Sequence, residues 1–184
     1  VRANNSANPA KVIGSVIVDL NGSFSPGSGS SYFSASLLEV NGTLSLNNGN
    51  ASGRTLTTTV GTLTGAGTIL VNDSNVTQDL SVADGDAFTG MITWAGPSSG
   101  ILRFGNNLAL AGSLVAPPGA AGKIDLQDKA VSFASVDLGN GFLAPGTYDY
   151  DDLIIDYPSL FVGSASGSIT VVAAVPESSF VAIL

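Results

Sequence analysis

The densest group of side chains that could do chemistry is a set of aspartates, Asp149, Asp151, Asp152 and Asp156, close together in the last quarter of the chain. Hard carboxylate oxygens are the ligands that Ca²⁺ prefers. Asp149, Asp151 and Asp152 therefore form a candidate calcium site, and no other cofactor is expected. The sequence Asp84-Gly85-Asp86 is a second candidate. Neither group has the ligand spacing of a calcium-binding loop, so a solvated acidic turn is the alternative interpretation.

The composition argues against catalysis. The chain has no histidine and no cysteine, which removes the commonest general base near neutral pH and two of the main transition-metal ligands. Paired carboxylates could still serve a β-helical enzyme that cleaves polysaccharides, but the sequence contains no nucleophile elbow and no phosphate-binding loop. We therefore expect that the protein is not an enzyme, and a polysaccharide-cleaving enzyme is the third alternative.

The charge pattern limits the partners. The net charge is −8 at pH 7, and the six basic residues are dispersed at Arg2, Lys11, Arg54, Arg103, Lys123 and Lys129. A surface without a basic stripe is a poor match for phosphates. We expect no nucleic-acid partner. Neither end of the chain contains an apolar run as long as the roughly 20 residues of a membrane span, so no span is expected in this chain.

Two further groups of polar and aromatic residues could bind or carry sugars. Trp94, Tyr148, Tyr150 and Tyr157 could serve as stacking platforms for a carbohydrate. Asn-x-Ser/Thr sequons, which are candidate glycosylation sites, occur at Asn4, Asn21, Asn41, Asn50, Asn72 and Asn75. The alternative interpretation of the sequons is turn chemistry, because Asn, Ser and Thr are favoured in turns.

The elements that must position these residues are short strands. In residues 41–71 apolar and hydroxyl side chains alternate, as in Thr43-Leu44-Ser45-Leu46, which places Leu on one face of a strand and Thr or Ser on the other. The Thr-rich run from Thr55 to Thr64 could expose a hydroxyl ladder of the kind that binds ice or sugar, or form the wet face of a strand. Strands are predicted at about 11–20, 34–40, 43–46, 55–63, 68–71, 79–83, 88–95, 101–104, 108–115, 123–127, 130–138 and into Val172. The segment 11–20 has a nearly continuous apolar character that predicts a buried strand, and Asp151-Asp152-Leu153 predicts a single helical turn.

A short phrase recurs along the chain: Gly, then Thr, Ser or Lys, then an aliphatic residue or Phe. The glycines of this phrase are residues 22, 42, 61, 67, 112, 122 and 167, and the first three are 20 and 19 residues apart. About 20 residues is a plausible length for one coil of a parallel β-helix. We therefore predict an all-β, parallel β-helix or solenoid-like single domain over residues 11–172, with an extended arm at 1–10 and an apolar tail at 173–184. A β-sandwich or jelly roll is the alternative.

Two stretches resemble known bacterial families. The sequence pattern GTLSL…VGTLTGAGTILV is similar to the autotransporter-associated β-strand repeat of secreted β-helical proteins. The ending, with Gly146-Thr147-Tyr148, Gly167-Ser168-Ile169 and Val175-Pro176-Glu177, resembles that of PEP-CTERM exported proteins, although residue 178 is Ser rather than Pro and no basic cluster follows. The resemblance implies export, a sorting signal, and a place at the cell surface or in the extracellular biofilm matrix of a bacterium.

These observations predict a secreted structural protein that assembles with copies of itself into an extracellular filament, sheath or matrix. Subunits would be held by strand addition, in which one chain pairs with the open sheet edge of another. The assembly residues are expected near the two ends, at Val12, Ile13, Ile169, Val171, Phe180 and Val181. The alternative function is a carbohydrate-binding or adhesion module of the cell surface, with extracellular polysaccharide as its partner.

Overall fold

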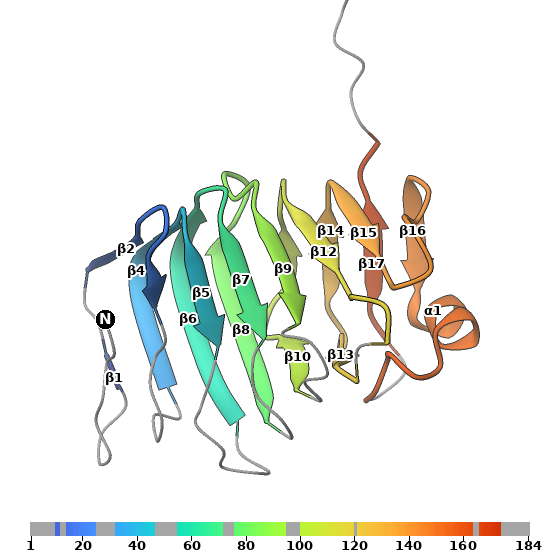
Figure 1. The fold of residues 1–184 in the computed structure, drawn as a ribbon. Helices are drawn as coiled ribbons and strands as arrows, with labels where there is room; N and C mark the ends of the chain where they lie inside the picture. Colours follow the sequence, from blue (N-terminus) through green and yellow to red (C-terminus); the bar gives the residue numbers. More distant parts are fainter. Residues whose placement is uncertain are drawn as a thin grey trace, which may run out of the picture.

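The chain forms a β-solenoid, in which short strands coil around one axis from β1 and β2 at one end to β16 and the helix α1 at the other (Figure 1). The structure is a computed structural model that describes residues 10–11, 14–24, 32–46, 55–71, 76–94, 100–119, 121–163 and 166–173. The prediction of a parallel β-solenoid is confirmed, because nearly all strand pairs are parallel. One coil takes 20 to 25 residues, as from Ser23 to Thr43 and from Thr43 to Thr68.

Three sheets make up the solenoid. The seven-stranded sheet contains β1 (Ala10–Lys11), β2 (Ser15–Val18), β4 (Tyr32–Val40), β6 (Thr55–Thr64), β8 (Thr77–Asp84), β10 (Ile101–Phe104) and β13 (Lys123–Asp125). The six-stranded sheet contains β3 (Ser23–Phe24), β5 (Thr43–Leu46), β7 (Thr68–Val71), β9 (Met91–Trp94), β12 (Ser113–Val115) and β15 (Ser135–Asp137). The four-stranded sheet runs in the order β11 (Leu108–Ala109), β14 (Ala130–Phe133), β17 (Ser168–Val171) and β16 (Gly146–Asp149).

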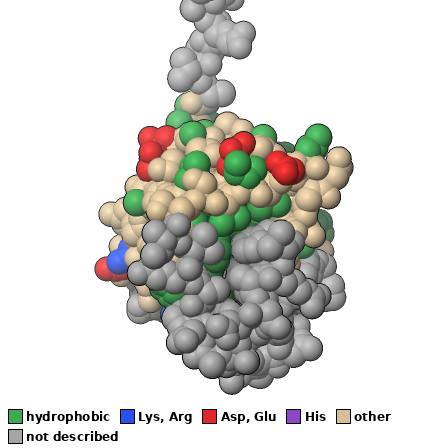
Figure 2. Space-filling model, turned by 90° about the vertical axis from the view of Figure 1, so that its left-hand side faces the viewer, with side chains coloured by type: hydrophobic (Ala, Val, Ile, Leu, Met, Phe, Trp, Pro, Cys, Tyr) green, Lys and Arg blue, Asp and Glu red, His purple; other side chains and the backbone are tan. Residues whose placement is uncertain are grey.

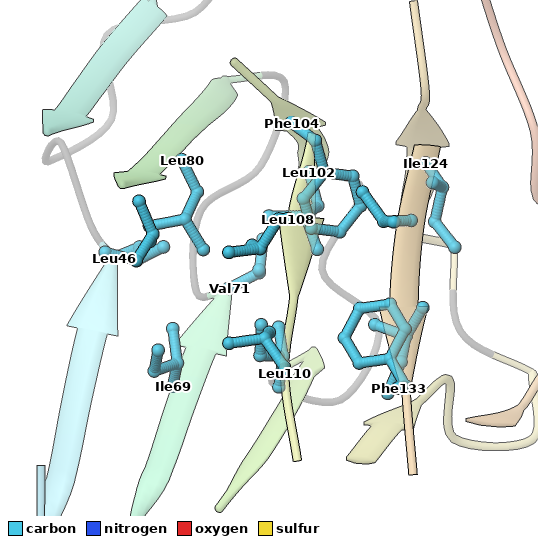
Figure 3. Packing of buried hydrophobic residues seen from close by; sticks show 14 of the residues in the cluster. Leu46, Ile69, Val71, Leu80, Leu102, Phe104, Leu108, Leu110, Ile124 and Phe133 are labelled. Atoms are coloured by element: carbon cyan, nitrogen blue, oxygen red, sulfur yellow. The ribbon is translucent and has the colours of Figure 1, made fainter. Parts of the chain in front are cut away.

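The core consists of apolar side chains stacked in register from coil to coil. In the six-stranded sheet, Leu44, Ile69, Ile92, Leu114 and Val136 pair in succession and are all fully buried. Figure 3 shows the same arrangement across the interior, where side chains from opposite sheets point toward one another. The alternation read from the sequence therefore places alternate residues inside, Leu44 and Leu46 in β5 and Ile69 and Val71 in β7, while Leu70 lies half-buried on the outer face.

A ladder of stacked glycines explains the recurring phrase. Gly22, Gly42, Gly67, Gly90 and Gly112 each precede a strand of the six-stranded sheet, and a Cβ at Gly42, Gly67, Gly90 or Gly112 would lie 2.0–2.3 Å from the carbonyl oxygen of the preceding glycine. That same oxygen accepts the N–H of the residue after the glycine, as in Thr68 N to Gly42 O at 2.8 Å. At Gly42, Gly67, Gly90 and Gly112 the coils approach so closely that only glycine fits.

The predicted repeat of 20 and 19 residues includes Gly61, which is not part of the glycine ladder. Gly61 lies inside β6, where its Cβ would meet Ser36 O at 2.5 Å, so it belongs to a bend in the long strand and not to the corner. The ladder instead passes through Gly90, which is followed by Met91 and so escapes a pattern that requires Thr, Ser or Lys.

A continuous face, which we call the third face, runs the whole length of the solenoid. It begins with β2, which pairs with the second half of β4, and continues through the ends of β6 and β8. The strand β11 lies next to β8 and leads into the four-stranded sheet. At this junction the Asn106 side chain replaces a strand residue: its Nδ2 donates to Val82 O at 2.6 Å and its Oδ1 accepts from Val82 N at 2.9 Å.

The C-terminal end of the solenoid is covered. Backbone bonds from Leu160 and Val162 close the edge of β13 at Ile124, with Ile124 N to Leu160 O at 2.8 Å and Val162 N to Ile124 O at 2.9 Å. Leu143 N donates to Val136 O at 2.8 Å and closes β15. The strand β16 pairs antiparallel with β17, and α1 (Tyr150–Asp156) follows it, which confirms and extends the predicted helical turn. Within the described chain, the outer edge of β16 is the strand edge left without a partner strand at this end.

The N-terminal end is built differently from the prediction. The segment 11–20 is not one buried strand, because β1 and β2 are separated, with Gly14 at a φ of 142° before β2. Its side chains are also largely exposed: Ile17 is 57% exposed and Leu20 is 76% exposed, whereas Val18 is buried. The reason is position, since β2 is the first strand of the third face and pairs only with β4 among the described residues. Figure 2 views this end of the molecule and shows hydrophobic side chains between uncharged and acidic ones.

Candidate functional site

The aspartates do not form a ligand group. Asp149 is the last residue of β16, and Asp151 and Asp152 are exposed in the first turn of α1. The part of the chain that the structure describes contains no group of three or more acidic side chains that could hold a metal ion, so the candidate calcium site is not supported. The first-turn carboxylates have a structural explanation, because negative charge stabilises the N-terminal end of a helix. The second candidate is a local turn in which Asp86 N donates to Asp84 Oδ1 at 3.4 Å.

Two of the four proposed aromatic platforms are unable to stack on a sugar. Trp94 is 2% exposed, its Nε1 donates to Gly100 O at 3.2 Å, and its indole ring fills the space that a Cβ at Gly122 would need. Tyr150 is 5% exposed and contacts Phe161 edge to face. Only Tyr148 and Tyr157 keep part of their surface accessible. Residue type alone does not separate these pairs, because the burial of each ring depends on which chain segments cover it.

A small cavity lies beside Tyr157. Its volume is about 190 Å³, and the residues that line it include Asn140, Asp156, Tyr157, Ser159 and Leu160. Desolvation, followed by the nearby Asp156 carboxylate, raises the pKa of Tyr157 above its ordinary value. Lys123 Nζ donates to Ser159 O at the wall of the cavity. The cavity is smaller than the roughly 300–1,000 Å³ of sites for drug-sized ligands, so it suits one ring at most.

The described sequons lie in turns of the coil corner. Asn21 is exposed with a φ of 65°, a left-handed conformation that Asn tolerates in turns. Asn41 is half-buried, and its Nδ2 donates to Glu39 Oε1 at 2.7 Å. Both are followed by a glycine of the ladder, so turn chemistry accounts for their position. Asn4, Asn50, Asn72 and Asn75 lie outside the described residues.

The seven-stranded sheet carries a column of charges on its outer face. Arg103 Nε and Nη2 each lie 2.9 Å from Asp125 Oδ2, and Asp79 is the paired residue on the other side of Arg103. Desolvation raises the pKa of Asp79, more than Arg103 lowers it. The Thr-rich run of β6 is mostly half-buried on this outer side, whereas Thr58 faces the core and is 1% exposed. The column is a structural ion pair with no adjoining cavity among the described ones.

The predicted assembly residues need a correction. Ile169 and Val171 are 0% and 5% exposed, and their strand β17 is paired on both sides, with β14 and with β16. Their role is therefore in the core of their own subunit. Val12, Ile13, Phe180 and Val181 lie outside the described residues, as do the arm at 1–9 and most of the tail.

The structural feature that sequence reasoning missed is the pair of end strands on the third face, β2 and β16. Each has one strand partner in the described chain and an opposite edge without one. The sequence signal for β16 is the phrase Gly146-Thr147-Tyr148, with which this strand begins.

None of the described helices is long and apolar enough to span a membrane. No protein-family model matches the chain, and the searches of curated proteins and of solved structures found no match.

Proposed function

We propose that this protein is a structural subunit of an extracellular assembly, a filament, sheath or matrix, in which copies join by strand addition. The observation that carries the proposal is the outer edge of β2, whose backbone groups on the side away from β4 have no partner strand among the described residues. An open strand edge is a template for pairing with another chain, and monomeric proteins usually protect such edges.

The composition supports a structural role. Charged residues make up only 11% of the chain, against about a quarter in typical globular domains. The strands β4, β6 and β8 of the seven-stranded sheet are 8 to 10 residues long. Among the described residues, the buried side chains are apolar apart from Thr58, Gln78 and Asp125. We expect no enzymatic activity, no nucleic-acid partner and no cofactor. Export and a bacterial cell-surface location are part of the proposal and rest on the resemblance to PEP-CTERM proteins.

Self-association of the full purified chain tests the proposal. Sedimentation velocity over an about hundredfold range of concentration should show species that grow with concentration, as mass action requires, and negative-stain electron microscopy should show elongated particles. Because each subunit carries a net charge of −8, added salt should screen the repulsion and favour assembly. A monodisperse monomer at the highest concentration and at high salt would contradict the proposal.

A carbohydrate-binding or adhesion module is the second candidate function, and the cavity beside Tyr157 is the observation that favours it. A carboxylate, an amide and a hydroxyl there accompany one accessible aromatic ring. These groups are suited to the hydroxyls and the apolar face of a neutral sugar. Amide chemical shifts of Asn140 and Tyr157 should change when methyl glycosides of neutral hexoses are added. Unchanged shifts, with polysaccharide arrays negative as well, would exclude this function.

A further inference from the structure

The two end strands of the third face match one another in length and position. β2 (Ser15–Val18) and β16 (Gly146–Asp149) each contain four residues and lie at opposite ends of the solenoid (Figure 1). They belong to one continuous face, so a second copy placed along the axis brings its β2 next to the β16 of the first. The other two sheets are closed at the C-terminal end by Leu160, Val162 and Leu143.

The backbone groups of β16 that point away from β17 can be identified. Tyr150 N donates to Gly167 O at 3.1 Å, so this pair is a hydrogen-bonded one in the antiparallel ladder. Hydrogen-bonded and non-hydrogen-bonded pairs alternate in such a ladder. The N–H and C=O groups of Thr147 and Asp149 therefore point outward, toward the edge without a partner strand.

The same reasoning applies to β2. Gly14 O accepts from Ser36 N at 3.0 Å, and Val18 O accepts from Asn41 N at 2.8 Å, so the even-numbered residues of this segment bond to β4. Every second residue of a parallel strand bonds to the same neighbour. The N–H and C=O groups of Ser15 and Ile17 consequently point away from β4.

We propose that β16 of one copy pairs with β2 of the next copy, antiparallel, with Thr147 opposite Ile17 and Asp149 opposite Ser15. This inference rests on the proposed function and names the two strands through which neighbouring subunits join. In a head-to-tail arrangement β2 of the second copy runs in the direction of β17, and β16 runs opposite to β17, so the new pair is antiparallel. The contact joins different surfaces of the two copies and does not close, which generates a filament.

The side chains agree with this register. Ile17 is 57% exposed on the outer surface, and Thr147 is exposed on the same surface, where its hydroxyl lies 3.0 Å from that of Thr170. On the inner side, Val16 and Tyr148 are both partly buried and pack against the core of their own subunit. Pairing Thr147 with Ile17 places Tyr148 opposite Val16, so the apolar interior continues across the joint. A shift of one residue would place apolar residues outside and is disfavoured.

A proline at position 149 tests the joint without disturbing the subunit. Asp149 has a φ of −76° and a ψ of 161°, which proline adopts, and its side chain makes no capping bond to α1. Asp149→Pro removes an outward N–H and places a ring at the edge, whereas the control Asp149→Ala keeps that N–H. We expect Asp149→Pro to weaken self-association at least about tenfold in dissociation constant, the equivalent of about 1.4 kcal/mol, with an unchanged circular dichroism spectrum. Asp149→Ala should retain or improve assembly because a negative charge is removed.

Disulfide trapping gives an independent measurement, because the chain has no cysteine of its own. Directly opposite residues of a hydrogen-bonded antiparallel pair lie about 5.5 Å apart at Cα, within the range that a disulfide spans. The double variant Thr147→Cys with Ile17→Cys should give a ladder of linked oligomers under oxidising conditions. The control Thr57→Cys with Ile17→Cys, with one cysteine on the outer face of β6, should not.

The outcomes separate this inference from the proposed function. If Asp149→Pro still assembles and the cysteine pair traps no oligomers, the β16–β2 joint is wrong while the structural role stands. Dimers trapped by Ile17→Cys alone would show a head-to-head contact and also overturn it. A chain that does not assemble at all would refute the proposed function itself.

Discussion

Replacing Gly67 by alanine tests whether the glycine ladder sets the spacing of the coils. The φ of Gly67 is outside the left-handed region, so the backbone itself permits alanine, and a Gly→Ala change at such a site ordinarily stabilises by about 0.4–1 kcal/mol. Here the new Cβ would lie 2.3 Å from Gly42 O, the atom that accepts the N–H of Thr68 at 2.8 Å. The coils must move apart to admit this Cβ. We expect the overpacking to lower the free energy of unfolding by about 1–3 kcal/mol, and the weakened hydrogen bond to lower it by about 1 kcal/mol more.

The net expectation for Gly67→Ala is a loss of about 2 kcal/mol, which changes the ratio of folded to unfolded protein about 30-fold. Urea unfolding followed by the fluorescence of Trp94, which is buried one coil away, measures this loss. The matched control is Gly22→Ala, because Gly22 is the first rung and the three atoms nearest its Cβ would all belong to the Asp19 backbone of its own turn, the closest at 2.9 Å. We expect the control to lose less than about 1 kcal/mol. A stabilised Gly67→Ala variant, or equal losses in both, would refute the steric argument.

Four further predictions concern polar groups. Arg103→Met should cost about 2–4 kcal/mol because it leaves the nearly buried Asp125 carboxylate unpaired, and adding Asp125→Asn should recover most of the loss in a double-mutant cycle. Gln78→Leu should stabilise by about 1–3 kcal/mol, measured as a higher urea midpoint, since the amide has no hydrogen-bond partner in the described chain. Asn106→Ala should cost about 2 kcal/mol and speed hydrogen exchange of the adjacent amides in β8, whereas no change in exchange would count against the strand-mimic role. Burial raises the pKa of Asp79 above 3.8 in the folded protein, so ionisation of Asp79 opposes folding. The free energy of unfolding therefore falls as the pH rises from 3.8 through the raised pKa. Asp79→Asn should be more stable than the parent protein at neutral pH and should lose that advantage below pH 3.8.

Local pattern predicted many strand bounds but not the corners. The predicted strands at 43–46, 68–71 and 101–104 match β5, β7 and β10. The predicted strands at 108–115 and 130–138 are each divided in two, because Gly112 and Ala134 turn the chain from one sheet to the next. A corner is specified by contact with the coil before it, and that coil lies more than 20 residues away in sequence. Apolar alternation within a window of a few residues does not contain this information.

The candidate sites were harder to predict because they depend on what covers each side chain. Trp94 and Tyr157 are both aromatic residues, and their surroundings in the fold differ. The chain at Gly122 covers Trp94, whereas a small cavity lies beside Tyr157. Likewise, the apolar alternation of Ile169 and Val171 suits an interior strand as well as an edge strand. The free edge of a strand is a property of sheet order, which the side chains of that strand do not determine.

The closed C-terminal end also has a consequence for how the chain acquires its structure. Each coil lacks a core of its own and is held by the coil beside it, so order propagates along the axis as in a one-dimensional zipper. Backbone bonds, the helix and the aromatic pair of Tyr150 and Phe161 hold the coils between β13 and α1, and the longest strand ladders hold β4, β6 and β8 together. Amide protection should therefore be lowest in β2, which has one strand partner among the described residues, and high in β4 and β6, which are paired on both sides.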